Sequence, residues 1–309
     1  MYEQLGQDGA GVAARSNVEL RVEVEGSAQL VEPLRPGRVV DQRSALDRSS
    51  DDLVVVQWDC SLAESSEPWV HEPDATPWRA GGRSARGRLC SVSERPQARA
   101  GSAYLVRPGD DGASPGPGVL VLHSWWGLTA GVKAYCNRLC DEGFAVLAPD
   151  LLDGLAPQTA AEAEFELART DPNATAGLVL SSTVALRSLT DDPSGPIAVI
   201  GFSMGASWAL WAAIRQPESF RRVVAYYGVQ SLAVDELTAD VLAHFPEHDD
   251  LIGDEELTDF EARLFEARKD PEIWHYPGTR HFFAEEAGDA FDAPAAALAW
   301  DRTLAFLRR

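Results

Sequence analysis

The chain has 309 residues and a formal net charge of −21, with 45% hydrophobic and 24% charged residues. This balance is typical of a soluble globular protein and excludes disordered and fibrous classes. Nucleic acid and anionic lipid surfaces need a basic footprint, so the acidic chain predicts neither as a partner. The sequence contains no run of about eighteen apolar residues and no basic-then-apolar leader, which predicts a cytoplasmic protein.

The four cysteines are Cys60, Cys90, Cys136 and Cys140. They form no CxxC pair, and no histidine stands at zinc-ligand spacing from them. We therefore expect free thiols and no metal site, with Cys136 and Cys140 one helical turn apart in a packing role.

Residues 1–95 lack a sustained hydrophobic period. Asp52–Asp59 is a possible strand, but the polar segments around it offer no second hydrophobic face for pairing. Trp58, Trp69 and Trp78 could anchor local structure. We expect a poorly structured extension here, which a start codon assigned too far upstream would also explain, and one domain over residues 96–309.

From about Gly101 onward, short apolar runs alternate with helical patterns, which is typical of β/α units wound into a mostly parallel sheet. The predicted strands lie, in chain order, at 102–108, 118–125, 143–151, 196–203, 223–228, 241–249 and 272–278. The predicted helices lie at 134–144, 175–189, 205–216, 254–270 and 294–309. Because the strands are apolar without polar alternation, we expect helices on both faces of the sheet.

The motif Gly201-Phe202-Ser203-Met204-Gly205 stands between a predicted strand and a predicted helix. At such a junction, glycines permit a strained turn that exposes the serine hydroxyl above the sheet. The alternative is that Ser203 only caps the helix. A capping serine would not need glycine on both sides, so we interpret Ser203 as a nucleophile.

A serine nucleophile needs a histidine base and an orienting carboxylate, which follow it in the order acid, then histidine, in this kind of fold. His281 lies in the loop after the last predicted strand, whereas His244, His248 and His275 lie in or beside strands and are interpreted as structural. The acid belongs in the loop after the segment VLAHF at 241–245, which reads Pro246-Glu247-His248-Asp249-Asp250. Spacing alone leaves Asp249, Asp250 and Asp254 open.

Hydrolysis also needs donors for the developing oxyanion. The backbone N–H of Met204 is one candidate, and the Trp125 N–H, in the loop His123–Gly127, is the second. Ser124 and Trp126 are candidates for the substrate pocket, because bulky aromatic residues suit the wall of an apolar site.

The segments HSWWGL, FAVLAPDLLDG, GFSMG, LAHFPEHDD and YPGTRHFF occur in this order over residues 100–309, and together they resemble the dienelactone hydrolase family. The resemblance implies an α/β-hydrolase fold without a large cap domain, and no metal or cofactor. It also implies cleavage of a small-molecule ester or lactone. The family's acid matches Asp249 and its base matches His281, and its oxyanion donors match the Trp125 and Met204 backbones.

Three departures limit the resemblance. The best-known members carry a cysteine nucleophile where Ser203 stands and a glutamate where Ser124 stands. Their arginine that holds the substrate carboxylate falls near Glu285, so a like-charge repulsion argues against dienelactone and for an uncharged ester or lactone. Two alternatives stay open, a binding module without turnover and an acyltransferase that uses the same residues. The oligomeric state is not determined by the sequence.

Overall fold

The computed structural model describes residues 16–25, 54–59, 100–108, 114–229, 234–267, 270–286 and 288–309. One sheet runs through the molecule in the order β2-β1-β3-β5-β4-β6-β7-β8-β9. Its strands are β1 (Ser16–Glu25), β2 (Val54–Asp59), β3 (Ala100–Arg107), β4 (Gly118–Leu122), β5 (Ala145–Pro149), β6 (Ile197–Phe202), β7 (Phe220–Tyr226), β8 (Asp240–His248) and β9 (Glu272–Arg280).

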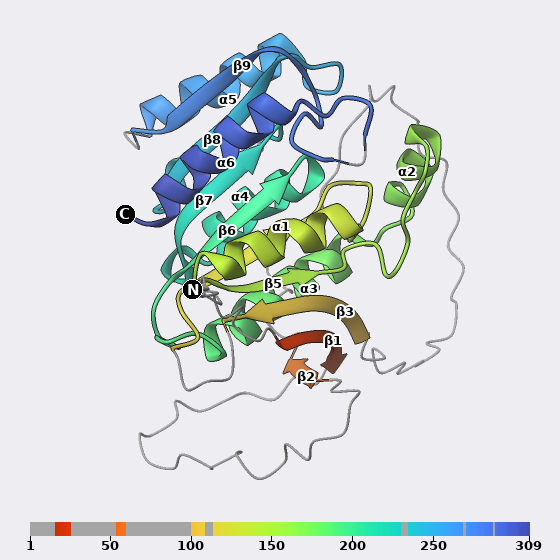
Figure 1. Cartoon of the computed structure of the whole chain (residues 1–309), viewed down its shortest axis with the longest axis vertical. Coiled ribbons are helices and arrows are strands. Elements are labelled where there is room, and N and C mark those ends of the chain that lie inside the picture. Colours follow the sequence, from red (N-terminus) through yellow and green to blue (C-terminus); the bar gives the residue numbers. More distant parts are fainter. Residues whose placement is uncertain are drawn as a thin grey trace, which may run out of the picture.

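The strands from β5 across to β9 are all parallel, whereas β3 is antiparallel to β5. The carboxyl ends of β4, β6, β7, β8 and β9 therefore meet at one edge of the sheet (Figure 1). Parallel α/β sheets bind ligands at this edge, because the loops after the strands converge there. The expected mostly parallel α/β architecture is confirmed.

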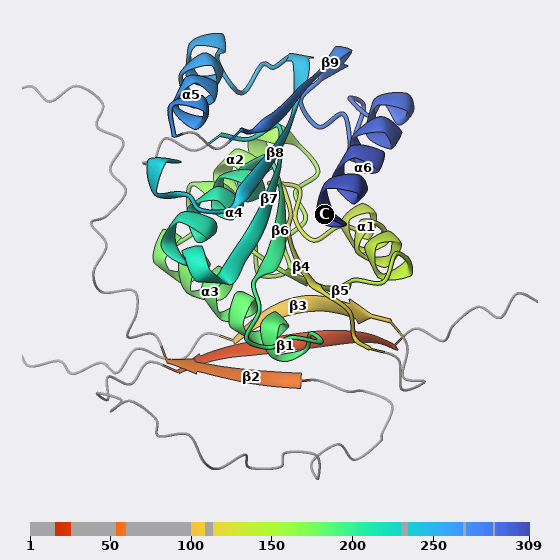
Figure 2. The same cartoon turned by 90° about the vertical axis from the view of Figure 1, so that its left-hand side faces the viewer.

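The described residues form six α-helices, of which the last follows the final strand: α1 (Ala130–Asp141), α2 (Ala160–Leu167), α3 (Pro172–Ser188), α4 (Met204–Arg215), α5 (Asp254–Glu266) and α6 (Ala293–Leu307). In the edge-on view, α1 and α6 cover one face, and α3, α4 and α5 cover the other (Figure 2). Both faces are therefore buried, which explains why the strands are apolar throughout.

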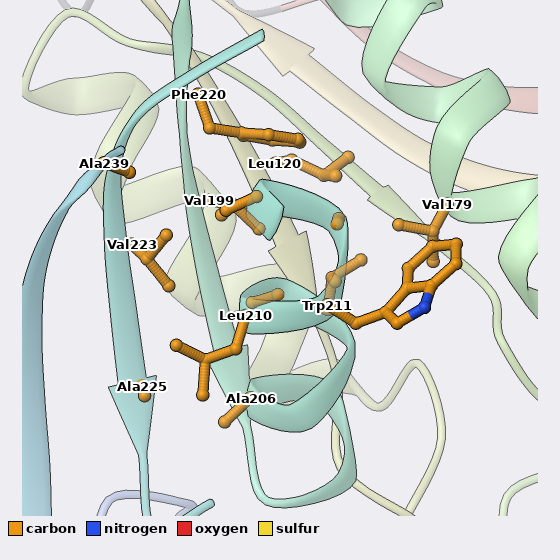
Figure 3. Close-up of a cluster of buried hydrophobic side chains, with 14 of the residues drawn as sticks. Leu120, Val179, Val199, Ala206, Leu210, Trp211, Phe220, Val223, Ala225 and Ala239 are labelled. Carbon is orange, nitrogen blue, oxygen red and sulfur yellow. The ribbon is translucent and has the colours of Figure 1, made fainter. Parts of the chain in front are cut away.

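Each face has its own hydrophobic core. On the α3 and α4 side, Leu210 and Trp211 pack with Val199 and Val223 of the sheet (Figure 3). On the α1 and α6 side, Phe202, Tyr226 and Trp300 belong to the second cluster. Alternate residues of β6 point to opposite faces, since strand side chains alternate.

The seven strands and five helices expected after residue 100 are all present, with shifts of a few residues at their ends. The short helix α2 was not expected. Thr159 caps it by accepting a hydrogen bond from the Glu162 N–H, but only Ala163 is buried, so no apolar stripe marks the helix in the sequence. Among the described helices, none combines the length and apolar character that a membrane span requires.

Two strands come from the N-terminal segment. The strand expected near Asp52–Asp59 is present as β2, but the expectation that it has no partner is wrong, because it pairs in parallel with β1. In turn, β1 pairs antiparallel with β3, so β1 and β2 extend the sheet beyond β3. Cys60, Cys90, Trp69 and Trp78 lie outside the described residues. The boundary between residues 95 and 96 stays a prediction.

Candidate active site

The turn after β6 carries Ser203 in a strained conformation, with φ 52° and ψ −117°. A Cβ at Gly201 would collide with the carbonyl oxygen of Gly205, and a Cβ at Gly205 would collide with that of Leu122. The two glycines therefore let α4 start directly above the strand ends. Strain of this kind persists where the surrounding structure over-determines it, and such positions cluster at functional sites.

The Ser203 side chain makes no capping hydrogen bond to α4. Instead, its Oγ lies 2.8 Å from Nε2 of His281, the residue that directly follows β9. The interpretation of Ser203 as a simple helix cap therefore lacks its defining contact.

Asp249 follows β8 and holds the other ring nitrogen of His281. Both carboxylate oxygens lie 2.8 Å from Nδ1, and the two side chains are each 7% exposed. A carboxylate can only accept, so Nδ1 carries the hydrogen and the unprotonated Nε2 accepts from the Ser203 hydroxyl. The Leu251 and Ile252 N–H groups also donate to Oδ1 of Asp249 and fix the carboxylate.

The geometry separates the three acid candidates, because Asp250 and Asp254 are exposed and only Asp249 contacts His281. The other histidines lie elsewhere. His248 is exposed, and His275 lies 2.9 Å from Glu261. His244 is fully buried between Tyr276 and Thr303, and burial together with the nearby Arg302 charge lowers its pKa to about 3.

The loop after β4 brings Ser124, Trp125 and Trp126 to the same edge. The Leu151 N–H donates to Nε2 of His123, so Nδ1 of this buried ring donates to the Ser124 carbonyl oxygen and fixes the loop. Trp125 stacks on Phe282, which follows His281, at 5.7 Å between ring centroids. Met204 is the first residue of α4, where backbone N–H groups have no helical acceptor.

Glu285 is the residue whose position differs most from expectation. It was expected opposite a substrate carboxylate, but its carboxyl group accepts from the Ser124 hydroxyl at 2.7 Å and from the Tyr227 hydroxyl at 3.1 Å. Glu285 thus places a carboxyl group beside Ser124, where the best-known members of the family carry a glutamate at position 124 itself. Burial raises the pKa of Glu285 to about 7, although both hydroxyl donors oppose the rise.

Tyr227 was not anticipated as a site residue. It follows β7 with a positive φ of 38°, and its ring centroid lies 5.0 Å from that of His281. Only its place near the end of the predicted apolar strand at 223–228 signalled it in the sequence. Cys136 and Cys140 are buried free thiols in α1, and no group of three or more potential metal ligands occurs among the described residues.

Comparison with known proteins gives a consistent result. The model of the dienelactone hydrolase family matches residues 102–309. A carboxymethylenebutenolidase from Pseudomonas putida is 26% identical over 222 residues, which cover 67% of this chain and 92% of the relative. A probable 2-oxo-3-(5-oxofuran-2-ylidene)propanoate lactonase from Bradyrhizobium is 28% identical over 228 residues, covering 67% and 88%.

Among solved structures, a putative dienelactone hydrolase from Klebsiella pneumoniae is similar, with a TM-score of 0.60 and 22% identity. The match covers 69% of this chain and 95% of that one. At this identity the match establishes the shared fold.

Proposed function

The chain belongs to the dienelactone hydrolase family, and from this premise we propose that it is a serine hydrolase that cleaves a small uncharged ester or lactone through an acyl-enzyme on Ser203. The observation that carries the proposal is the continuous hydrogen-bonded series from Ser203 through His281 to Asp249. A nucleophile, a base and an orienting acid within hydrogen-bond reach are what acyl transfer requires.

In the proposed reaction, the Ser203 oxygen attacks the carbonyl carbon while Nε2 of His281 takes the hydroxyl proton. Asp249 keeps Nδ1 protonated and stabilises the imidazolium. The tetrahedral oxyanion receives hydrogen bonds from the Trp125 and Met204 N–H groups. His281 then gives the proton to the departing alkoxide, and a water molecule activated by the same ring hydrolyses the acyl-enzyme.

The uncharged substrate is inferred from Glu285. The carboxyl group beside Ser124 would meet any substrate carboxylate that approached from this side. When ionised it would repel that group. This inference is tested by measuring kcat/KM for dienelactone and for a short uncharged ester such as 4-nitrophenyl acetate. A much higher value for dienelactone would contradict this part of the proposal.

A fluorophosphonate probe tests the nucleophile directly. The native protein is expected to become labelled, and Ser203→Ala is expected to abolish labelling and lower turnover at least about a thousandfold. His281→Ala should lower turnover by a similar factor, since base and nucleophile act as one unit. A native protein that remains unlabelled would instead fit a binding module without turnover.

The proposal names water as the acceptor of the acyl group. Release of the free acid when no second alcohol is present would support hydrolysis over acyl transfer to an alcohol. A cytoplasmic location is proposed from the sequence, and cell fractionation tests it.

A further inference from the structure

A cavity of about 740 Å³ lies on the α1 and α6 face of the sheet, beside the nucleophile instead of around it. Ser203, His281 and Asp249 do not line it. Its volume falls in the range that small-molecule sites of proteins occupy, roughly 300–1,000 Å³.

The spacing of small residues on the two helices creates this cavity. Gly131, Ala134, Tyr135 and Arg138 of α1 line it at intervals of three, one and three residues. Ala293, Ala296, Ala297 and Trp300 of α6 line it at the same intervals. Residues so spaced share one face of a helix, so each helix presents small side chains at one end of its stripe and large ones at the other.

The large residues hold the helices apart. The Tyr135 and Trp300 rings meet edge to face with centroids 5.1 Å apart, and the Arg138 guanidinium lies 3.9 Å from the Trp300 centroid. Because glycine and alanine do not fill the space beside this contact, a hollow remains. Phe202 and Tyr226, with ring centroids 4.7 Å apart, line the cavity from the sheet.

Three lining residues connect the cavity with the site. Trp126 follows Trp125 in the chain, and Phe282 follows His281, whose ring centroid is 4.3 Å away. The third, Glu285, accepts the hydrogen bond from Ser124. A ligand in the cavity would therefore end next to the bond that Ser203 attacks.

Charge and hydroxyl groups define what the cavity accepts. Glu285, Glu286 and Asp289 contribute carboxyl groups to its lining, and the guanidinium of Arg138 stacks on Trp300. This excess of carboxyl groups disfavours an anion. Neutral polar groups of the lining include the Tyr135 and Tyr226 hydroxyls, which lie 3.4 Å apart.

These hydroxyls belong to a buried series that runs through Thr303 and His244 to Tyr276. Arg302 interacts with the Tyr276 hydroxyl and can only donate, so we assign the Tyr276 hydrogen to Nδ1 of His244. Nε2 then donates to Thr303, whereas either hydroxyl can be the donor in the Thr303–Tyr226 and Tyr226–Tyr135 pairs. The series can therefore turn a hydroxyl hydrogen toward an oxygen of a ligand.

We propose that this cavity binds the larger uncharged, apolar end of the ester, so that the stripes on α1 and α6 determine substrate size. The assignment rests on the proposed hydrolase function and adds a substrate class to it: uncharged esters with one extended alkyl or aryl end.

The test narrows the cavity from each wall in the full-length protein. Ala134→Leu and Ala296→Leu add bulk from α1 and α6, and Ala305→Leu is the matched control, because Ala305 is an exposed α6 residue outside the cavity lining. The first substrate pair, 4-nitrophenyl acetate and 4-nitrophenyl octanoate, differs only at the acyl end. The second pair, ethyl acetate and octyl acetate, differs only at the alcohol end.

Both cavity variants are expected to lower the long-to-short ratio of kcat/KM at least about tenfold in one of the two pairs, with unchanged melting temperature. Ala305→Leu should change neither ratio more than about twofold. The pair that responds identifies the end that enters. If both ratios stay at the wild-type value in both cavity variants, the proposal is overturned.

A second measurement addresses charge. In the wild-type protein, 1-octanol should inhibit hydrolysis of the responding long ester competitively, and octanoate should inhibit at least about tenfold more weakly. Equal inhibition by the anion would contradict the assigned ligand class. Turnover of the short esters and labelling of Ser203 test the hydrolase function separately, since failure there would appear with every substrate and in the wild-type protein.

Discussion

The two faces of the sheet differ in the residue types that pack against them. On the α3, α4 and α5 side, Ala, Val, Leu, Ile, Phe and Trp form the hydrophobic core, and the buried hydroxyls of Ser181 and Thr183 donate to backbone carbonyls of α3 itself. On the α1 and α6 side, tyrosines, a buried histidine and a buried threonine form a hydrogen-bonded series next to a cavity. One face thus gives the Ser203 turn a close-packed support, and the other offers space and polar groups to a ligand.

The largest expected effect lies at the strand ends that the two faces share. Asp249→Asn should lower kcat/KM at least about a thousandfold, because His281 would lose the tautomer that accepts from Ser203. Asp250→Asn, one residue away and exposed, should change it less than about threefold. Ester hydrolysis at neutral pH measures both. The reverse order would move the acid to Asp250.

The close-packed face should show the larger cost in stability. Leu210→Ala removes a fully buried side chain from α4 and should lower the free energy of unfolding by about 2–5 kcal/mol. Leu298→Ala on α6, where the leucine is 46% exposed, should cost less than about 1 kcal/mol. Urea denaturation measures both. Equal losses of unfolding free energy in the two variants would contradict the view that the α4 side provides the packed core.

The polar face should make stability depend on pH at its acid end. His244 has a folded-state pKa of about 3, below its ordinary value of 6.5, so the unfolded chain binds the proton first as the pH falls. The stabilisation is complete above about pH 6.5 and is lost toward pH 3.

Between pH 6.5 and pH 4.5 the loss should reach roughly 2–3 kcal/mol. His244→Gln should remove this slope, whatever its stability at neutral pH. His275→Gln, at an exposed histidine, is the matched control and should retain it. Urea denaturation across the pH series measures the slope, and an unchanged slope in His244→Gln would contradict the assigned pKa.

Glu285 should give a smaller effect of opposite sign. Its folded-state pKa of about 7 lies above the ordinary 4.5, so the folded state favours the protonated form. Its stabilisation is complete below about pH 4.5 and is lost as the pH rises to 7.

Glu285→Gln should therefore gain roughly 1–2 kcal/mol on the wild-type protein between pH 6 and pH 8. Glu286→Gln, at the exposed neighbouring residue, should follow the wild-type curve. The difference in unfolding free energy between the two pH values is the measurement. A Glu285→Gln curve parallel to wild type would show that this carboxyl group titrates normally.

Local sequence patterns predicted most of the fold. Strands without polar alternation, separated by helices of regular apolar period, specify a parallel sheet covered on both faces, because no other arrangement buries them. The short helix α2 escaped prediction because it buries little, and the pairing of β1 with β2 and β3 escaped because partners distant in the sequence leave no local signal.

The candidate site divides in the same way. The sequence by itself determined Ser203, since glycines on both sides of a serine between strand and helix specify the turn. It also determined His281, which comes directly after the last strand. Spacing could not choose Asp249 over Asp250, because neighbouring residues stand at almost the same distance from the other motifs. What separates them is the direction in which their side chains point. The family resemblance favoured Asp249, and the fold brings its carboxylate to the ring.

Only the tertiary structure decided the environment of these groups. The partners of Glu285 come from the ends of β4 and β7, far from residue 285 in the sequence, so neither its hydrogen bonds nor its raised pKa has a local pattern. The cavity likewise exists only because α1 and α6 turn their small residues toward each other. The residues of the candidate site are marked in the sequence by the turns that carry them, whereas burial and empty space arise only when distant segments pack.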